Sequence, residues 1–164
     1  NGLNNLIQAD ILTLPFADNT IDSIFEVGVV EHLYQEDPFL GQTVNREAIV
    51  KSFKELKRVL KPHGKVGFIQ PSKHSTLPQS KKIDRMLNLW TFGFQEDFAL
   101  NDFNQLLAIA GFSEIKYAIL QAPSDFPLRI RVGDRFLKTF YTLTKQYRKA
   151  ELTGALFAVV GTKI

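Results

Sequence analysis

The sequence contains no cysteine, which excludes a disulfide framework, a thiolate metal site and a cysteine nucleophile. Its ten glycines are scattered, and no two of them form the G-x-G pattern that lets a backbone approach a phosphate group closely. No apolar run approaches the roughly 18 consecutive residues that a membrane-spanning helix needs. With these classes excluded, we expect a protein that folds around an ordinary apolar core.

What is present is typical of a single globular domain. The 164 residues are 45% hydrophobic and 23% charged, which excludes a disordered or fibrous chain. The net charge is uneven, because residues 1–120 hold 12 Lys and Arg against 14 Asp and Glu, whereas residues 121–164 hold 8 against 3. This basic part indicates a solvated surface or contact with an anion, and the excess is too small to predict nucleic-acid binding. We expect a cytoplasmic protein.

An alternation of strand and helix signals predicts an α/β sheet. The clearest helix covers residues 45–60, where apolar residues recur at spacings of 4, 3 and 4 and form one stripe. A nearly continuous apolar run over residues 21–30 predicts a strand that is buried on both faces. We expect further strands at residues 6–9, 65–69, 112–120 and 155–162, and further helices at residues 78–89, 101–110 (with Asn101 as N-cap) and 131–149.

A series of short motifs in this order resembles the middle of class I S-adenosylmethionine-dependent methyltransferases of the type 11-like group. The motifs are Ala9-Asp10, Leu14-Pro15-Phe16-Ala17-Asp18-Asn19, Ile21-Asp22-Ser23-Ile24-Phe25, Val29-Val30-Glu31-His32-Leu33, the segment 55–64 and Ala110-Gly111-Phe112. The resemblance covers residues 6–120 and resumes at the last strand. It implies a Rossmann-like α/β fold whose last strand is antiparallel, and S-adenosyl-L-methionine as cofactor.

The sequence departs from that family at the glycine-rich loop, which in the family follows the first strand and approaches the cofactor. The resemblance places residues 6–9 in the family's third strand, so we expect a domain truncated at its N-terminus, without the first two strand-helix units. Residues 1–164 then form a single partial domain, with residues 121–150 as a basic amphipathic insertion between the last two strands. We expect an unpaired edge on the central strand, a fragment that is inactive alone, and a requirement for the missing N-terminal segment.

The resemblance implies a cofactor site made by the ends of two strands. Asp10 would accept a hydrogen bond from the adenine amino group, and Ile11 would contact the ring. Glu26 and Val27 would lie beside the methionine part of the cofactor, where a carboxylate near the sulfonium is electrostatically favourable. For Asp10 the alternative is an exposed turn residue, and for Glu26 it is a strand-end carboxylate turned to solvent.

Candidate catalytic and substrate residues come from the same end of the predicted sheet. His32 and Glu26 are candidate bases, since both can accept a proton from the acceptor; for His32 the alternative is a structural or pocket-lining role. His74, just past a predicted strand, and Trp90, in an aromatic-rich segment that otherwise belongs to the core, are candidate substrate contacts. No set of histidine and carboxylate residues has metal-ligand spacing, so we expect no metal site.

Residues 131–149 combine an apolar stripe with a basic one. The apolar stripe consists of Val132, Phe136, Phe140, Leu143 and Tyr147. Such a helix either contacts an anionic membrane from one side or packs its stripe on the body of the protein.

These observations predict methyl transfer from S-adenosylmethionine to a small-molecule acceptor in the complete enzyme, with a lipid-like acceptor as one candidate. The alternative is a non-catalytic remnant that acts as a protein interaction module through its free strand edge. A nicotinamide-dependent dehydrogenase fits less well, because it also requires the glycine loop.

Overall fold

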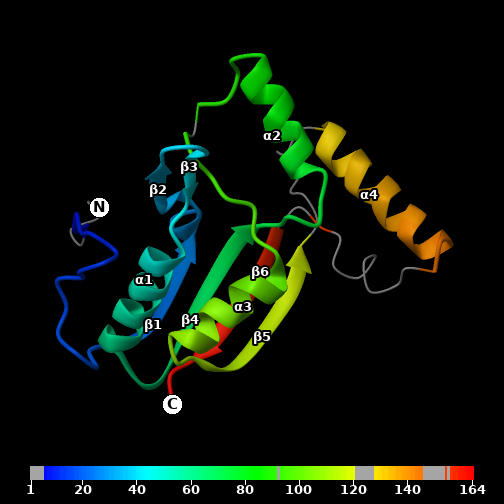
Figure 1. The fold of residues 1–164 in the computed structure, drawn as a ribbon. Helices are drawn as coiled ribbons and strands as arrows, with labels where there is room; N and C mark the ends of the chain where they lie inside the picture. Colours follow the sequence, from blue (N-terminus) through cyan, green and yellow to red (C-terminus); the bar gives the residue numbers. More distant parts are fainter. Residues whose placement is uncertain (1–5, 92, 121–127, 146–153, 155) are drawn as a thin grey trace, which may run out of the picture.

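The computed structural model describes residues 6–91, 93–120, 128–145, 154 and 156–164. Its centre is a four-stranded sheet with the order β1-β4-β6-β5 (Figure 1). The strands are β1 (Ile21–Val27), β4 (Leu60–Pro71), β5 (Ser113–Leu120) and β6 (Leu156–Thr162). β1 runs parallel to β4, and β6 lies between β4 and β5 and is antiparallel to both. This arrangement confirms the predicted Rossmann-like α/β fold with an antiparallel last strand.

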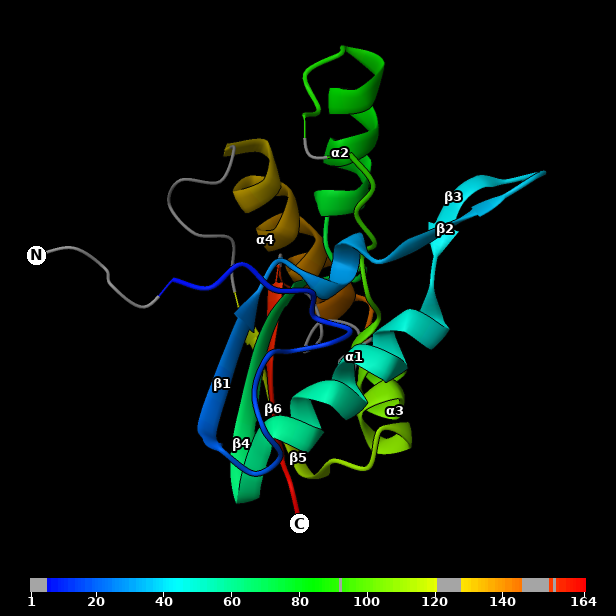
Figure 2. The same ribbon diagram turned by 90° about the vertical axis from the view of Figure 1, so that its left-hand side faces the viewer.

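Two helices, α1 (Arg46–Val59) and α3 (Leu100–Ile109), cover one face of this sheet (Figure 2). Their apolar stripes meet the strands in a cluster of buried aromatic rings with centroids 5.0 to 5.5 Å apart. Phe103 lies at the centre of this cluster and is fully buried. The ring contacts join Phe53, Phe68, Phe98, Phe103 and Phe157. The stripe that predicted a helix at residues 45–60 therefore builds the core.

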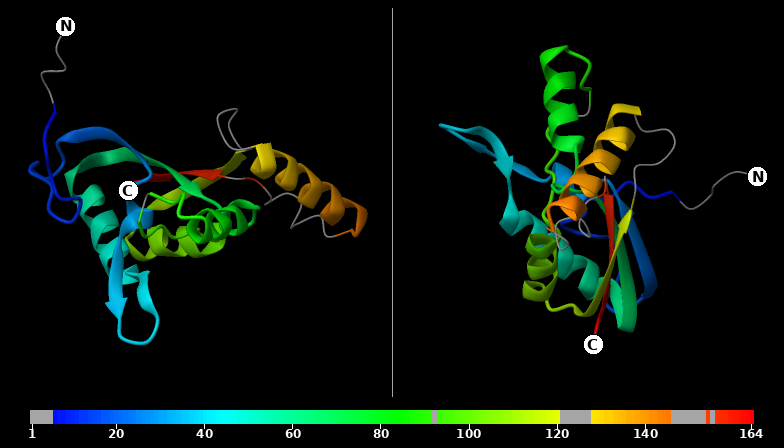
Figure 3. Two further views of the ribbon diagram at one scale, coloured as in Figure 1. Left: turned by 90° about the horizontal axis from the view of Figure 1, so that it is seen from above. Right: turned by 90° about the vertical axis from the view of Figure 1, so that its right-hand side faces the viewer.

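The opposite face of the sheet is not covered by any helix among the residues that the structure describes (Figure 3). Apolar side chains on the strands are consequently exposed there. Phe25 and Val27 of β1 are 69% and 55% exposed, and Val160 of β6 is also exposed. β1 also forms an outer edge of the described sheet, because β4 is the neighbour with which it pairs. The strand predicted to be buried on both faces is thus buried on one.

The remaining elements lie beyond the carboxyl ends of β1 and β4 (Figure 1). They are the 3-10 turn η1 (Val30–His32), the hairpin of β2 (Tyr34–Asp37) and β3 (Gly41–Val44), and the helices α2 (Leu77–Met86) and α4 (Leu128–Leu143). The sequence analysis missed the hairpin and the 3-10 turn. Both follow Gly28, whose φ of +72° turns the chain sharply after β1, so β1 is shorter than the predicted run over residues 21–30.

Two other expectations about local structure were wrong. Residues 6–9 form no strand and are exposed, since no described strand lies beside them to supply hydrogen-bond partners. The cap of α3 is Ala99, not Asn101, because the helix begins at Leu100 and buries that side chain in the core.

The helix predicted at residues 131–149 is observed as α4 up to Leu143, and residues 146–149, including Tyr147, lie outside the described part. Of the two alternatives for its apolar stripe, packing on the body is not what the described side chains show. Val132, Phe136, Phe140 and Leu143 are 54%, 72%, 47% and 78% exposed. A different contact positions this helix: Asp134 accepts hydrogen bonds from the backbone N–H and the hydroxyl of Thr76, at 2.7 and 2.9 Å.

Candidate functional site

The carboxyl ends of the adjacent parallel strands β1 and β4 hold a buried pair of polar side chains. Glu26 is 6% exposed, and Gln70 is fully buried. The Glu26 carboxylate accepts hydrogen bonds from the backbone N–H groups of Val29 and Val30, at 2.5 and 3.2 Å, and from Nε2 of Gln70 at 2.5 Å. These bonds fix the turn between β1 and η1, so Glu26 does not point to solvent as the simpler sequence interpretation allowed.

Burial raises the pKa of Glu26 to about 7, from an ordinary value of 4.5, because water no longer stabilises the charged carboxylate. The neighbouring charge of Glu31 raises the pKa further, whereas the hydrogen bonds from Val29, Val30 and Gln70 lower it. Glu26 is therefore a carboxyl group that gains and loses a proton near neutral pH.

A second carboxylate, Glu31, is buried beside this pair, at 1% exposure. Its Oε1 accepts a hydrogen bond from Nε2 of Gln95 at 3.2 Å, and its backbone carbonyl accepts one from the N–H of Glu96 at 2.9 Å. Oε2 of Glu31 and Oε1 of Gln70 are buried and have no hydrogen-bond partner in the described structure. The cluster thus has two buried acceptors that remain available for a donor.

His32 is held against the same loop. Its Nδ1 lies 2.5 Å from the carbonyl oxygen of Phe94. Because a carbonyl only accepts, Nδ1 carries the proton in this contact and Nε2 is the nitrogen left to take up a proton. The geometry accommodates both sequence interpretations, since the ring has a structural contact through one nitrogen and a basic nitrogen at the other.

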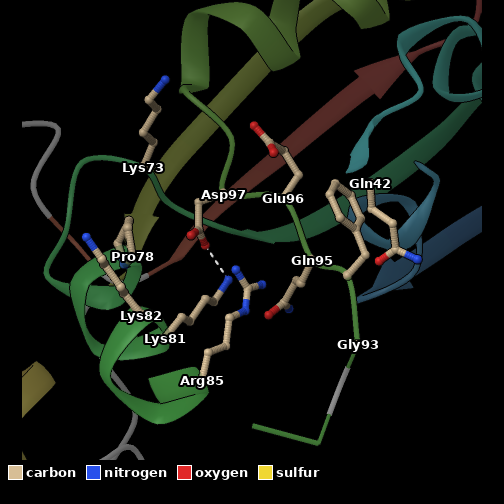
Figure 4. A pocket seen from close by; sticks show the side chains of 11 residues that line it. Gln42, Lys73, Pro78, Lys81, Lys82, Arg85, Gly93, Gln95, Glu96 and Asp97 are labelled. Carbon is tan, nitrogen blue, oxygen red and sulfur yellow. Dashed lines mark hydrogen bonds and ion pairs between the residues drawn. The ribbon is translucent and has the colours of Figure 1, made fainter. Parts of the chain in front are cut away.

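A cavity of about 590 Å³ lies between α2 and the segment 93–97 (Figure 4). Lys81 and Asp97 form an ion pair at its centre, and both side chains are largely buried. Burial lowers the pKa of Lys81 and raises that of Asp97. The Trp90 ring lies under two of the cations of α2, 5.6 Å from the Lys81 amino group and 5.4 Å from the Arg85 guanidinium.

The residues predicted to bind the cofactor lie away from this cavity. Asp10 is exposed, and its Oδ1 accepts a hydrogen bond from the N–H of Leu12 at 2.8 Å. Ile11 is half-buried against the core, and Val27 is exposed on the uncovered face of the sheet. These positions fit one side of a nucleotide-like cofactor, a carboxylate beside an apolar contact, but the described glycines provide no cradle for the other side.

The two predicted substrate residues lie next to the cavity and are not part of its lining. His74 is exposed, and its backbone N–H donates to the Ser72 hydroxyl at 3.1 Å. Trp90 donates from Nε1 to the carbonyl of Gly93 at 2.7 Å and orders the loop beside the cavity. Within the described ranges no group of three metal-ligating side chains occurs.

Sequence reasoning missed the residues that form the cavity wall. Lys81 and Arg85 lie on one helix and Asp97 follows at least 12 residues later, and a helix with several cations is too common a pattern to predict an ion pair. The acidic dipeptide Glu96-Asp97 beside the basic helix at residues 78–89 was the available signal. Gln70 carried no signal, because a glutamine at a strand end is usually solvated.

Comparison with known proteins relates the N-terminal part of the chain to one family. Residues 1–68 match the model of a methyltransferase domain. A search of curated proteins finds no match.

Solved structures with the same fold are S-adenosylmethionine-dependent methyltransferases. One from Thermotoga maritima, described as a possible histamine N-methyltransferase, has 18% identity and a TM-score of 0.61 over 96% of this chain and 63% of its own. One from Archaeoglobus fulgidus has 13% identity and a TM-score of 0.61, over 97% and 67%. A phosphoethanolamine N-methyltransferase from Haemonchus contortus, solved with S-adenosylhomocysteine, has 15% identity and a TM-score of 0.50, over 94% and 36%.

The chain therefore spans less than two thirds of the length of the Thermotoga protein. The matching segment contains β1, which carries Glu26, and η1, which carries Glu31 and His32. Residues 1–68 match the model of a methyltransferase domain, and the chain as a whole has a fold similar to that of these S-adenosylmethionine-dependent methyltransferases.

Proposed function

We propose that this protein takes part in methyl transfer from S-adenosyl-L-methionine to a small-molecule acceptor. The observation that carries the proposal is the buried Glu26–Gln70 pair at the carboxyl ends of adjacent parallel strands, inside the segment that matches a methyltransferase domain. Ligands of open α/β sheets bind at this end of the strands. The sulfonium of the cofactor already activates the methyl group, so the protein mainly orients the acceptor and excludes water.

In this proposal the residues of the chain have separate roles. Asp10 and Ile11 hold the adenine, and Val27 lies beside the methionine part with Glu26 behind it. Glu26 has a pKa of about 7 and His32 has a basic Nε2, so either can take the proton that the acceptor loses. Gly28 makes the turn after β1, because its positive φ of +72° disfavours any other residue.

We also propose that cofactor binding requires a segment in addition to the residues described. The uncovered sheet face with Phe25 and Val27, and the free edge of β1, support this proposal. A further strand on that edge would place its own loop beside Asp10 and supply the missing cradle. The chain of 164 residues is then inactive by itself.

A lipid-like acceptor and peripheral contact with a membrane are part of the proposal. The exposed stripe of α4, flanked by Arg135 and Lys138, supports both, because apolar and cationic side chains together favour an anionic lipid surface. No helix in the described ranges is long and apolar enough to span a bilayer. Such contact would be made from a cytoplasmic location.

Titration of S-adenosylhomocysteine by calorimetry tests the cofactor site. We expect micromolar binding to a form of the protein with additional residues before Asn1, and weaker or no binding to residues 1–164 alone. In the longer form Asp10→Ala should weaken binding about tenfold, since it removes a hydrogen bond to the adenine. The matched control is Asp18→Ala, which changes an exposed aspartate in the same loop.

The second candidate is an interaction module that binds a partner strand through β1. The free edge of β1 favours it. Absence of S-adenosylhomocysteine binding by every form of the protein would contradict the methyltransferase proposal and leave this candidate as the explanation of the fold.

A further inference from the structure

The cavity between α2 and segment 93–97 carries an excess of positive charge. Four cationic side chains line it, against two carboxylates. The cations are Lys73, Lys81, Lys82 and Arg85, and the carboxylates are Glu96 and Asp97. Figure 4 shows the Lys81 amino group and the Arg85 guanidinium converging beside Asp97 and Gln95, whereas Lys73 and Lys82 extend away from this centre.

The ion pair at the centre leaves part of this positive charge without a salt-bridge partner. Lys81 and Asp97 neutralise each other, and their burial makes the pair a fixed wall of the cavity. In the described part of the chain, Lys73, Lys82 and Arg85 form no salt bridge. Arg85 is therefore the cation near the centre whose charge is not compensated by a contact.

The contact with Trp90 holds the guanidinium of Arg85 in a position from which it can bind an anion. The guanidinium lies 5.4 Å from the ring centroid, within the range of a cation–π contact, and no hydrogen bond or salt bridge among the described residues uses its N–H groups. The N–H groups at the edge of the guanidinium remain available for a pair of parallel hydrogen bonds, the geometry in which arginine binds phosphate and carboxylate. The volume of about 590 Å³ lies in the range of small-molecule sites.

We propose that this cavity binds a phosphate monoester through Arg85, and the net positive charge of the lining side chains favours such an anion. A phosphate monoester carries close to two negative charges at neutral pH, which matches several cations better than a single carboxylate does. Gln42 and Gln95, which also line the cavity, offer amide donors for the remaining oxygens. The ester would be the methyl acceptor, and only that role rests on the function proposed above; the binding itself does not require the cofactor.

The test is calorimetric titration of glycerol 1-phosphate into the 164-residue chain, with glycerol and glycerate as uncharged and carboxylate comparisons. We expect binding of the phosphate ester, weaker binding of glycerate and none of glycerol. Arg85→Ala should weaken the binding roughly 10- to 100-fold, because it removes a charge-assisted bidentate contact. Arg85→Lys should keep only part of the affinity for the phosphate ester, since lysine keeps the positive charge but lacks the pair of parallel N–H donors of the guanidinium.

Arg46→Ala is the matched control, because Arg46 is an exposed arginine on α1 and lines the other described cavity. Equal loss in the Arg46 and Arg85 variants, or equal affinity for glycerate and the phosphate ester, would overturn the proposal. Arg85 is exposed in the last turn of α2, and the circular dichroism of its variants should match that of the parent chain.

Vesicles distinguish a soluble ester from a lipid headgroup. Phosphatidic acid has a phosphate monoester headgroup, whereas phosphatidylglycerol has a diester. Binding to phosphatidic acid in preference to phosphatidylglycerol, lost in Arg85→Ala, would assign the site to a lipid; binding of glycerol 1-phosphate alone would assign it to a soluble ester. Binding of neither overturns the proposal. Phosphate binding without S-adenosylhomocysteine binding would leave it standing and contradict the proposed function alone.

Discussion

At the scale of single residues, Glu26 is a carboxylate that the fold buries at a cost. Three hydrogen bonds compensate part of the lost hydration, and the negative charge of Glu31 works against them. Folding therefore favours the protonated form of Glu26. The free energy of unfolding depends on pH as a result, and the sign of that dependence follows from the direction of the pKa change.

Because the pKa of Glu26 is about 7 in the folded state and near 4.5 in an exposed chain, the folded protein binds the proton more tightly. The free energy of unfolding should fall as the pH rises from about 4.5 to 7 and then level off. Glu26→Gln should remove about 2 to 3 kcal/mol of the difference between pH 5 and pH 8, measured by urea unfolding at both values. The glutamine can still accept from Val29 and Val30, and a turned Gln70 amide offers its unpartnered Oε1.

Asp22→Asn is the control, because Asp22 lies at the other end of β1, is exposed, and has a pKa lowered by its hydrogen bond to Lys61. Its replacement should leave the slope between pH 5 and pH 8 unchanged. An equal slope in Glu26→Gln and in the parent chain would contradict the raised pKa of Glu26.

At the scale of elements, α4 is attached to the molecule through the start of α2. Asp134 is 1% exposed and accepts two hydrogen bonds from Thr76, the residue that precedes α2. Gly133 allows the close approach, because a Cβ at this position would lie 2.8 Å from Cγ2 of Thr76. The carboxylate also lies at the positive end of the α2 dipole. This contact sets the place of a helix whose apolar stripe faces outward.

Asp134→Ala should release α4 while the sheet stays folded. Removal of a buried carboxylate that accepts two hydrogen bonds costs about 1 to 3 kcal/mol, which is enough to open a helix attached by few other contacts. Hydrogen-deuterium exchange should become faster in α4 and in the first turn of α2, with unchanged protection in β4. Arg135→Ala, at the exposed neighbouring position, should leave the exchange of all three elements as it is. If exchange changed in β4 alone and stayed the same in α4, the result would contradict this attachment.

At the scale of the whole molecule, α1 and α3 cover one face of the sheet. The other face is bare, because no helix among the described residues covers it. Exposed apolar side chains on a sheet with a free edge promote association between chains. We expect residues 1–164 to self-associate in sedimentation velocity at micromolar concentration, and Phe25→Lys to reduce the association by placing a charge on the bare face. Phe39→Lys, at the 94% exposed tip of the hairpin, should not reduce it. A monomeric parent chain would contradict this expectation.

The elements that the sequence predicted well are those whose signal is local. The helix at residues 45–60 has a regular apolar stripe and an N-cap at Asn45, which accepts a hydrogen bond from the N–H of Ala48 at 2.9 Å. Residues 6–9 have the composition of a strand but form none, because a strand also requires a neighbour, and composition does not supply one. The hairpin after η1 was missed, since its polar strands have no apolar alternation.

Part of the candidate site could also be predicted, because its signal is local in the sequence. The position of Glu26 at a strand end was visible in the sequence, because strand ends of parallel sheets meet at one edge. Its partner Gln70 and the pair of Lys81 with Asp97 were not, because they form only when segments distant in the sequence pack together. Burial decides which polar side chains have a shifted pKa, and burial depends on how distant segments pack together.

The position of β6 between β4 and β5 has a consequence for how the molecule is made. A ribosome releases β4 and β5 well before β6, so the nascent chain holds both strands without the one that joins them. β1, α1 and β4 can assemble early, because all three precede β5 and β6 in the chain and β1 pairs with β4 in parallel. β5 must wait for β6, which is made after it, and until then β4 and β5 each keep an unpaired strand edge that chaperones can bind.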